Sequence, residues 1–261
     1  MMYNPSKEDL RAMRMRANEI YKKSLWPCTG MSLLYTVVSL ALSVLTLFIT
    51  NPFLYAVTLL VLAFIAASLQ LGLCEYFLRL RKGERPGARL LVRYFDQDSL
   101  PMVAVLALIN WAAGMIGMLL VGLSFLLTIV VSALVFLAPY LFVLREGRGK
   151  PVALLREGIT RMQGRWDMYL RILVRQYLYA IVASLAASML MMLVITALNS
   201  LGLAAFFSTT AGYMACVLIL AAAVNAFITA YFQIYLAEFA SATLEPLKPL
   251  KSEKQESDFI L

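Results

Sequence analysis

The longest uncharged stretch of the chain, residues 176–237, reads QYLYAIVASLAASMLMMLVITALNSLGLAAFFSTTAGYMACVLILAAAVNAFITAYFQIYLA and holds no Asp, Glu, Lys or Arg. A helix rises about 1.5 Å per residue, so about 20 residues cross the roughly 30 Å hydrocarbon core of a bilayer. The stretch is too long for one crossing and predicts a hairpin of two transmembrane helices. Turn-forming residues at Asn199–Gly202 and Ser208–Thr210 mark its turn.

Two more uncharged stretches, residues 24–74 and 99–144, have the same character. Asn51-Pro52 interrupts the first, and Gly122–Ser124 is the best break in the second. The sequence therefore predicts an all-α fold, a polytopic membrane helical bundle of six transmembrane helices arranged as three hairpins. The predicted spans are Pro27–Thr50, Phe53–Phe77, Pro101–Val121, Phe125–Leu144, Gln176–Leu198 and Ala211–Leu236.

The composition agrees with a membrane protein. Of 261 residues, 62% are hydrophobic and 15% charged, whereas soluble domains are roughly half apolar and about a quarter charged. We expect a single integral-membrane domain over residues 1–261. It divides into a cytoplasmic interfacial helix (1–26), a six-span bundle (27–240) and a cytoplasmic tail (241–261).

Lysine and arginine predict the orientation. All 23 lie in the N-terminal segment, the loops after the second and fourth spans, and the tail. The three opposite turns carry none. Because basic residues accumulate on the cytoplasmic side, we expect both termini to be cytoplasmic.

An internal similarity suggests repeated units. YFLRLRKGERPGARLL (Tyr76–Leu91) resembles YLFVLREGRGKPVALL (Tyr140–Leu155) once one residue is inserted before the proline. In both, a span ends in Leu-Arg, turns at a glycine and restarts after a proline. We expect three parallel units, each a short basic helix followed by a transmembrane hairpin.

The basic segments are amphipathic. One apolar face holds Leu155, Ile159, Met162 and Trp166, beside Arg156, Glu157, Arg161 and Arg165. A second holds Leu10, Met13, Ala17 and Ile20, beside Arg11 and Arg14. Such helices are expected to rest on anionic lipid headgroups, and the alternative is docking of a cytoplasmic partner. Nucleic-acid binding is not expected, because topology accounts for the basic residues.

Polar residues near the spans have two interpretations. Asn110, Asn225 and Gln233 are expected to hydrogen-bond between helices, or alternatively to line a substrate path. Glu75 lies four residues before Arg79, a spacing that favours an ion pair. We expect Glu238 to pair with Arg171 or Arg175, at the start of the neighbouring helix. A ligand-binding or coupling role is the alternative for both acids.

Catalytic signatures are missing from the sequence. The chain has no histidine and no G-x-x-x-x-G-K-[ST] phosphate loop, and its three cysteines are isolated. We predict no catalytic residue, no cofactor and no metal site, and the protein is not expected to be an enzyme.

The runs REGRGKPVALLREGITRMQGRWDMYLRILV (Arg145–Val174) and LGLCEYFLRLRKGERP (Leu71–Pro86), with the opening RANEIYKKSLW, resemble a family of bacterial multi-pass membrane proteins. This family is catalogued as domain of unknown function 975 and is similar in turn to the membrane domain of some glycerophosphoryl diester phosphodiesterases. The resemblance implies a helical bundle of about this topology in a bacterial inner (plasma) membrane, with no assigned activity or cofactor. The Pro-Tyr expected in the last hairpin is absent, although Pro139-Tyr140 ends the fourth span.

Two function classes follow. The favoured one is a transport or permease-type membrane subunit that works with a separate cytoplasmic ATPase or another membrane partner. The alternative is a membrane-organising or partner-binding scaffold that interacts with anionic lipids. The sequence predicts neither the substrate nor the oligomeric state.

Overall fold

The computed structural model describes residues 7–46, 49–119, 124–200 and 210–244, and within these ranges every regular element is a helix. Among the residues that the structure describes, four helices are long and apolar enough to cross a membrane, with apolar windows at Leu25–Leu42, Pro52–Arg81, Leu100–Gly117 and Trp166–Ala197. A shorter apolar run follows at Ile129–Leu144. The chain is therefore an all-helical protein with the character of a membrane protein.

The helices, in chain order, are α1 (Lys7–Lys23), α2 (Leu25–Thr46), α3 (Pro52–Arg81), the 3₁₀ turn η1 (Ala88–Val92), α4 (Leu100–Leu119), α5 (Ser124–Val135), α6 (Leu137–Leu144), α7 (Pro151–Met162), α8 (Trp166–Ser200) and α9 (Thr210–Leu244). Each predicted span falls on one of them or, for the fourth, on the pair α5 and α6. The predicted turns at 122–123, 201–202 and 208–209 lie outside the described residues.

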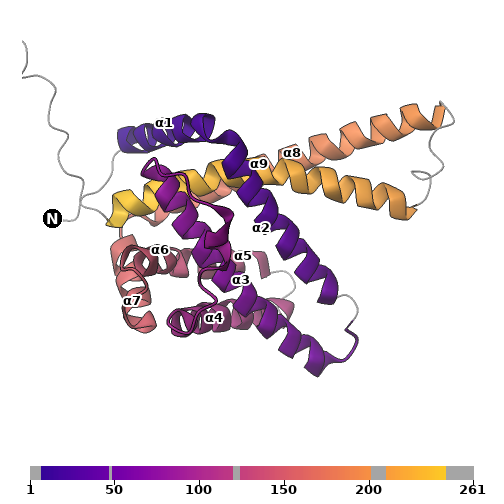
Figure 1. Cartoon of the computed structure of the whole chain (residues 1–261). Helices are drawn as coiled ribbons and strands as arrows, with labels where there is room; N and C mark the ends of the chain where they lie inside the picture. The colour runs from indigo at the N-terminus through magenta and orange to yellow at the C-terminus, as the bar shows by residue number, and fades with distance from the viewer. Residues whose placement is uncertain (1–6, 47–48, 120–123, 201–209, 245–261) are drawn as a thin grey trace, which may run out of the picture.

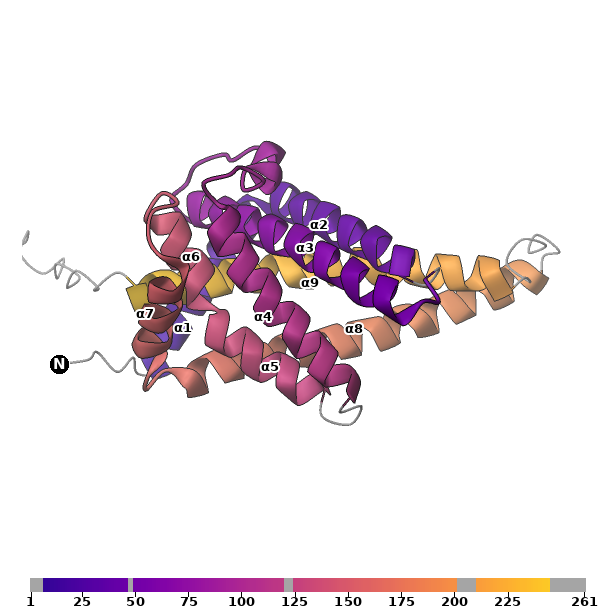
Figure 2. The ribbon, with the colours of Figure 1, turned by 90° about the horizontal axis from the view of Figure 1, so that it is seen from below.

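The helix pairs α2–α3, α4–α5 and α8–α9 run side by side and point the same way (Figures 1 and 2). In each pair, the end of the first helix and the start of the second lie at one end of the molecule. The start of α1, the end of α9, η1 and α7 lie at the other, which we call the basic end because the described Lys and Arg residues belong to the segments gathered there. In Figure 1, α8 and α9 extend past the other hairpins.

Sequence-encoded caps set several helix ends. Asn51 caps α3, its side-chain oxygen accepting hydrogen bonds from the backbone N–H of Phe53 at 2.9 Å and of Leu54 at 3.2 Å. At the other end Gly83 adopts φ +83°, and Gly147 does the same after α6 with φ +81°. The predicted glycine closure of both helices is confirmed.

The fourth predicted span is broken at Phe136. Pro139 has no N–H to donate to the carbonyl of Val135, so the α-helical hydrogen-bond pattern is interrupted there. The segment continues as the separate helix α6, which is buried from Leu137 to Phe142.

The core of the basic end consists of three related segments. Leu73-Cys74-Glu75-Tyr76 in α3, Leu137-Ala138-Pro139-Tyr140 in α6 and Leu236-Ala237-Glu238-Phe239 in α9 share a small residue at the second position and an aromatic ring at the fourth, and all twelve residues are buried. The three helices contact one another. These three similar segments therefore pack near one another at the basic end, and the structural equivalence of whole units stays a prediction.

Both amphipathic helices bury their apolar faces in protein. Met13 and Ala17 of α1 are buried in the main core, and α1 lies along α9. In α7 the buried residues are Leu154, Gly158 and Met162, packed mainly against α6. The expectation that these apolar faces rest on lipid is wrong for α1, because α9 covers its face. In α7 the buried face is displaced from the predicted one, since Leu155 and Ile159 are only partly buried. Helix α7 also stops before Trp166, which belongs to α8.

Candidate functional site

Glu75 is the centre of a charged cluster at the basic end. Its side chain is only 6% exposed, and it pairs with Arg79 at 2.6 Å and also with Arg93. The pair with Arg79 was predicted and is confirmed. Arg93, from the loop after η1, joins it because η1 packs against α3. A carboxylate buried to this degree requires such partners.

Tyr94 completes the cluster. Its ring is buried and lies 5.9 Å from the guanidinium carbon of Arg93. Burial raises the pKa of Tyr94, and a hydrogen bond with Glu75 and the negative charge of that carboxylate raise it further. Tyr94 therefore stays a neutral phenol near pH 7.

The cluster borders an open cavity of about 930 Å³ at the basic end. Charges of both signs line it: Arg79, Lys82, Arg93 and Arg148, with Glu75, Glu84, Asp96, Asp98 and Glu146. Within the described part of the chain, no group of three or more Asp, Glu or Cys residues is placed to hold a metal ion.

Glu238 has a different partner from the one predicted. Its buried carboxylate accepts a hydrogen bond from Nε of Arg81 at 3.0 Å. Arg171 instead pairs with Asp167 one turn earlier on α8, at 3.1 Å. The prediction failed because the neighbouring helix is not the only one within reach, and the end of α3 also packs against α9.

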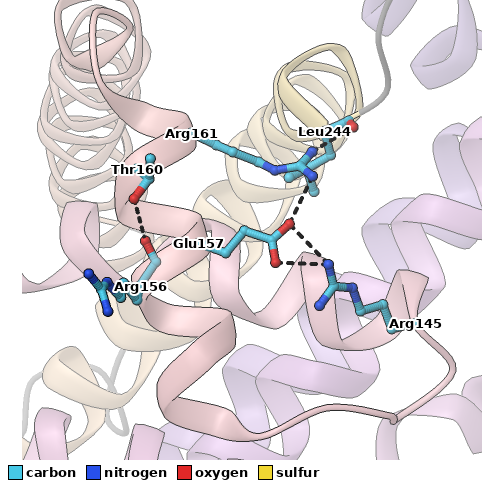
Figure 3. Close-up of polar contacts among 6 residues, drawn as sticks. All are labelled: Arg145, Arg156, Glu157, Thr160, Arg161 and Leu244. Carbon is cyan, nitrogen blue, oxygen red and sulfur yellow. Dashed lines mark hydrogen bonds and ion pairs between the residues drawn. The ribbon is translucent and has the colours of Figure 1, made fainter.

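A third cluster joins α6, α7 and α9 (Figure 3). Nη2 of Arg145 donates to both carboxylate oxygens of Glu157, at 3.0 and 2.8 Å. Arg161 pairs with Glu157 at 2.8 Å and donates to the backbone carbonyl of Leu244, also at 2.8 Å. Arg161 therefore caps the last turn of α9. Figure 3 shows Arg156 pointing away from this cluster.

A groove between α1, α8 and α9 brings together two of the predicted surface residues and one predicted ion-pair residue. Arg11 and Arg14 reach it from α1, and Arg175 from α8. Tyr21 of α1, Leu178 and Tyr179 of α8 and the mainly aromatic side chains of α9 line much of the rest, and the groove has a volume of about 930 Å³. We call it the α1–α8–α9 groove.

The predicted amides do not form a common site. Asn110 is exposed on α4, whereas Asn225 and Gln233 are partly buried on α9. Within the described residues no hydrogen bond of these three side chains is found, so the interhelical ties expected for them are not present. Trp111, next to Asn110, does tie two helices, donating from Nε1 to the carbonyl of Ala56 at 3.0 Å.

The remaining predicted docking residues lie near α7. Arg156 is exposed, and Arg165 and Trp166 are partly buried where α7 turns into α8. Sequence reasoning missed Arg81 and Arg93 as partners of buried carboxylates, and Arg145 as the partner of the partly exposed Glu157. The signal available for Arg81 was the likeness of the α3 and α9 segments, which places Glu75 and Glu238 at equivalent positions.

No family model, no curated protein and no solved structure matches this chain. The resemblance to the bacterial multi-pass family therefore stays a prediction that rests on the sequence runs alone.

Proposed function

We propose that this chain is a plasma-membrane protein that crosses the bilayer six times, has both termini in the cytoplasm and binds anionic lipid with its basic end. The observation that carries the proposal is the separation of the two ends. The hairpin tips point one way, and the described basic residues gather at the opposite end (Figure 2).

This separation suits a membrane surface. The cytoplasmic leaflet is negatively charged, and each Lys or Arg near it contributes about 1 kcal/mol of attraction. Exposed aromatic residues lie next to the basic segments. Trp26 at the start of α2 is 75% exposed, and Tyr179, one turn after Arg175 on α8, is 55% exposed. Tryptophan and tyrosine favour this interface between headgroups and hydrocarbon.

A non-catalytic role is part of the proposal. Glu75, Glu157 and Glu238 are each held by one or two arginines from another turn or helix. Such pairs tie α3, α6, α7 and α9 together. We therefore assign these carboxylates to structure, and the protein to lipid organisation or partner binding.

The proposal is tested by the lipids that stay with the protein. The full chain is extracted from membranes with a nanodisc-forming polymer, and phosphatidylglycerol and phosphatidylethanolamine are quantified in the discs and in the bulk membrane. We expect phosphatidylglycerol to be enriched in the discs. Equal ratios in discs and bulk membrane would contradict the proposal.

A transport-type subunit with a separate ATPase is the second candidate function. The polar cavity beside Glu75 favours it, because its mixed charges suit a loop of a soluble partner, and Arg148 lines it. Affinity purification of the tagged chain would then recover an ATP-hydrolysing protein. A R148E variant should lose that protein while the chain stays folded. Purification without any ATPase would count against this function.

A further inference from the structure

The α1–α8–α9 groove carries positive charge that no acidic lining residue neutralises. Arg11, Arg14 and Arg175 are exposed, and the lining found among the described residues includes no Asp or Glu. Elsewhere at the basic end, the buried carboxylates of Glu75 and Glu238 hold Arg79 and Arg81, and the partly exposed Glu157 holds Arg145. Among the described residues, the groove thus brings three arginines together with no carboxylate in its lining.

Arg14 and Arg175 both lie near Tyr235 in the groove, whose lining also includes Arg11. Arg14 and Arg175 both act electrostatically on the Tyr235 hydroxyl. A hydrogen bond to Tyr231, together with the nearby Tyr231 hydroxyl, raises the pKa of Arg14. Tyr231 therefore helps to hold the Arg14 guanidinium in the groove.

The groove becomes apolar away from the basic end. Phe227 precedes Tyr235 by eight residues on α9, which is about 12 Å along a helix. Between them the wall includes Ile228 and Phe232, and Leu178 faces it from α8. Leu178 is 58% exposed and Phe227 38% exposed, so this wall is open to the surroundings of the helices.

Aromatic packing keeps this wall in place. The rings of Tyr21 and Tyr231 lie 5.6 Å apart in an edge-to-face arrangement, and those of Tyr179 and Phe232 lie 6.0 Å apart. Tyr21 also donates from its hydroxyl to the carbonyl of Phe227 at 3.3 Å. The groove is a preformed feature that joins three helices.

We propose that this groove binds one anionic glycerophospholipid, with its phosphate against Arg11, Arg14 and Arg175 and an acyl chain along Phe227, Ile228 and Leu178. The order of charge and apolar surface in the groove matches the order of headgroup and chain in a phospholipid. A free phosphate would occupy only the arginine end. The inference rests on the proposed function and gives its lipid a defined place.

The test compares two sets of three arginines. The full chain is delipidated in detergent and titrated with phosphatidylglycerol or phosphatidylcholine, and bound lipid is counted by native mass spectrometry. The groove variant is R11Q/R14Q/R175Q, and the matched control is R85Q/R148Q/R156Q, which removes equal charge from exposed positions outside the groove. About 1 kcal/mol per arginine is about fivefold in affinity, so the groove variant should bind phosphatidylglycerol roughly 100-fold more weakly. The control should stay within about threefold of the unmodified chain.

A second variant tests the apolar wall. F227A leaves the three arginines intact and should still weaken phosphatidylglycerol binding several-fold. Inorganic phosphate at equal concentration should not displace the lipid, because it contacts only the arginine end. Unfolding is monitored by circular dichroism, and the three arginines are exposed enough for glutamine to replace them.

The outcomes separate the two proposals. Equal weakening in the groove variant and the control would mean diffuse attraction, which overturns the groove site and leaves the proposed function intact. Unchanged binding in the groove variant or in F227A, or displacement by phosphate, would also overturn the site. An unmodified chain that does not prefer phosphatidylglycerol over phosphatidylcholine would contradict the groove site and the proposed function together.

Discussion

Arg81 and Glu238 lie 157 positions apart in the sequence and form an ion pair of 3.0 Å between the last turn of α3 and the inner end of α9. The Glu238 side chain is 5% exposed and that of Arg81 is 22% exposed. Solvent therefore screens the attraction between these two charges only weakly. It joins the first and last hairpins at the basic end.

Exchanging the charges of Arg81 and Glu238 should show how strongly the two side chains stabilise each other. R81E and E238R should each lower the midpoint of thermal unfolding in detergent, because each places like charges together. The double variant R81E/E238R should recover part of the loss, with a coupling energy of about 0.5–3 kcal/mol. R171E/E238R is the control for the pairing expected from sequence, and it should recover nothing. Recovery by R171E and not by R81E would contradict the structure.

Gly72 allows α3 to touch the η1 segment. A Cβ atom there would lie 2.4 Å from the carbonyl oxygen of Leu90 and 2.7 Å from Cα of Leu91. Both are backbone atoms, so G72A should displace η1 and destabilise the protein by about 1–3 kcal/mol. The control is G114A on α4, which meets no atom within 4 Å and should be neutral or slightly stabilising. Equal melting temperatures for G72A and the unmodified chain would refute this contact.

Removing the charge of Glu75 should weaken its ion pairs with Arg79 and Arg93. Because the Glu75 side chain is buried and Arg79 and Arg93 are half-exposed, E75Q should cost about 1–3 kcal/mol of stability. E84Q is the control, since Glu84 is half-exposed and 3.8 Å from Arg79, and it should cost under about 1 kcal/mol. Thermal unfolding in one detergent measures both. A larger effect from E84Q than from E75Q would be inconsistent with the cluster.

The sequence predicts where the helices lie along the chain better than it predicts which helices contact one another. Uncharged stretches locate the apolar helices, because the length of a helix and the cost of placing a charge in a membrane are local properties. The Glu75–Arg79 pair is local too, being one helical turn apart. The pairing of Glu238 depends on which helix end arrives beside it, and that is a property of tertiary packing.

For the amphipathic helices too, the sequence indicates an apolar face but not what covers it. The pattern of Leu10, Met13, Ala17 and Ile20 correctly indicates one apolar face on α1, but lipid and a neighbouring helix are equally good partners for such a face. In the structure α9 covers it. The α1–α8–α9 groove could not be predicted either, since Arg14 and Arg175 come from distant segments.

The Glu157 cluster should hold α7 in place. E157Q weakens the ion pairs with Arg145 and Arg161, all three being partly exposed, so we expect a loss of about 1 kcal/mol. Backbone amides of α7 should then exchange with deuterium faster. R156Q, whose side chain points away from Glu157, is the matched control and should leave exchange unchanged (Figure 3). Unchanged exchange in E157Q would show that apolar packing alone holds α7.

The central claim is that the basic end faces the cytoplasm and the hairpin tips face outward, and cysteine accessibility in intact cells tests it most directly. Single cysteines are introduced into a variant in which Cys28, Cys74 and Cys216 are replaced by alanine. Alanine suits the Cys74 position, because Ala237 holds the same place in the similar segment of α9. We predict that N51C, S124C and S200C react with a membrane-impermeant maleimide from outside, and that R85C and K150C react only after the cells are opened. Labelling of R85C and K150C in intact cells, with N51C and S200C protected, would contradict the account.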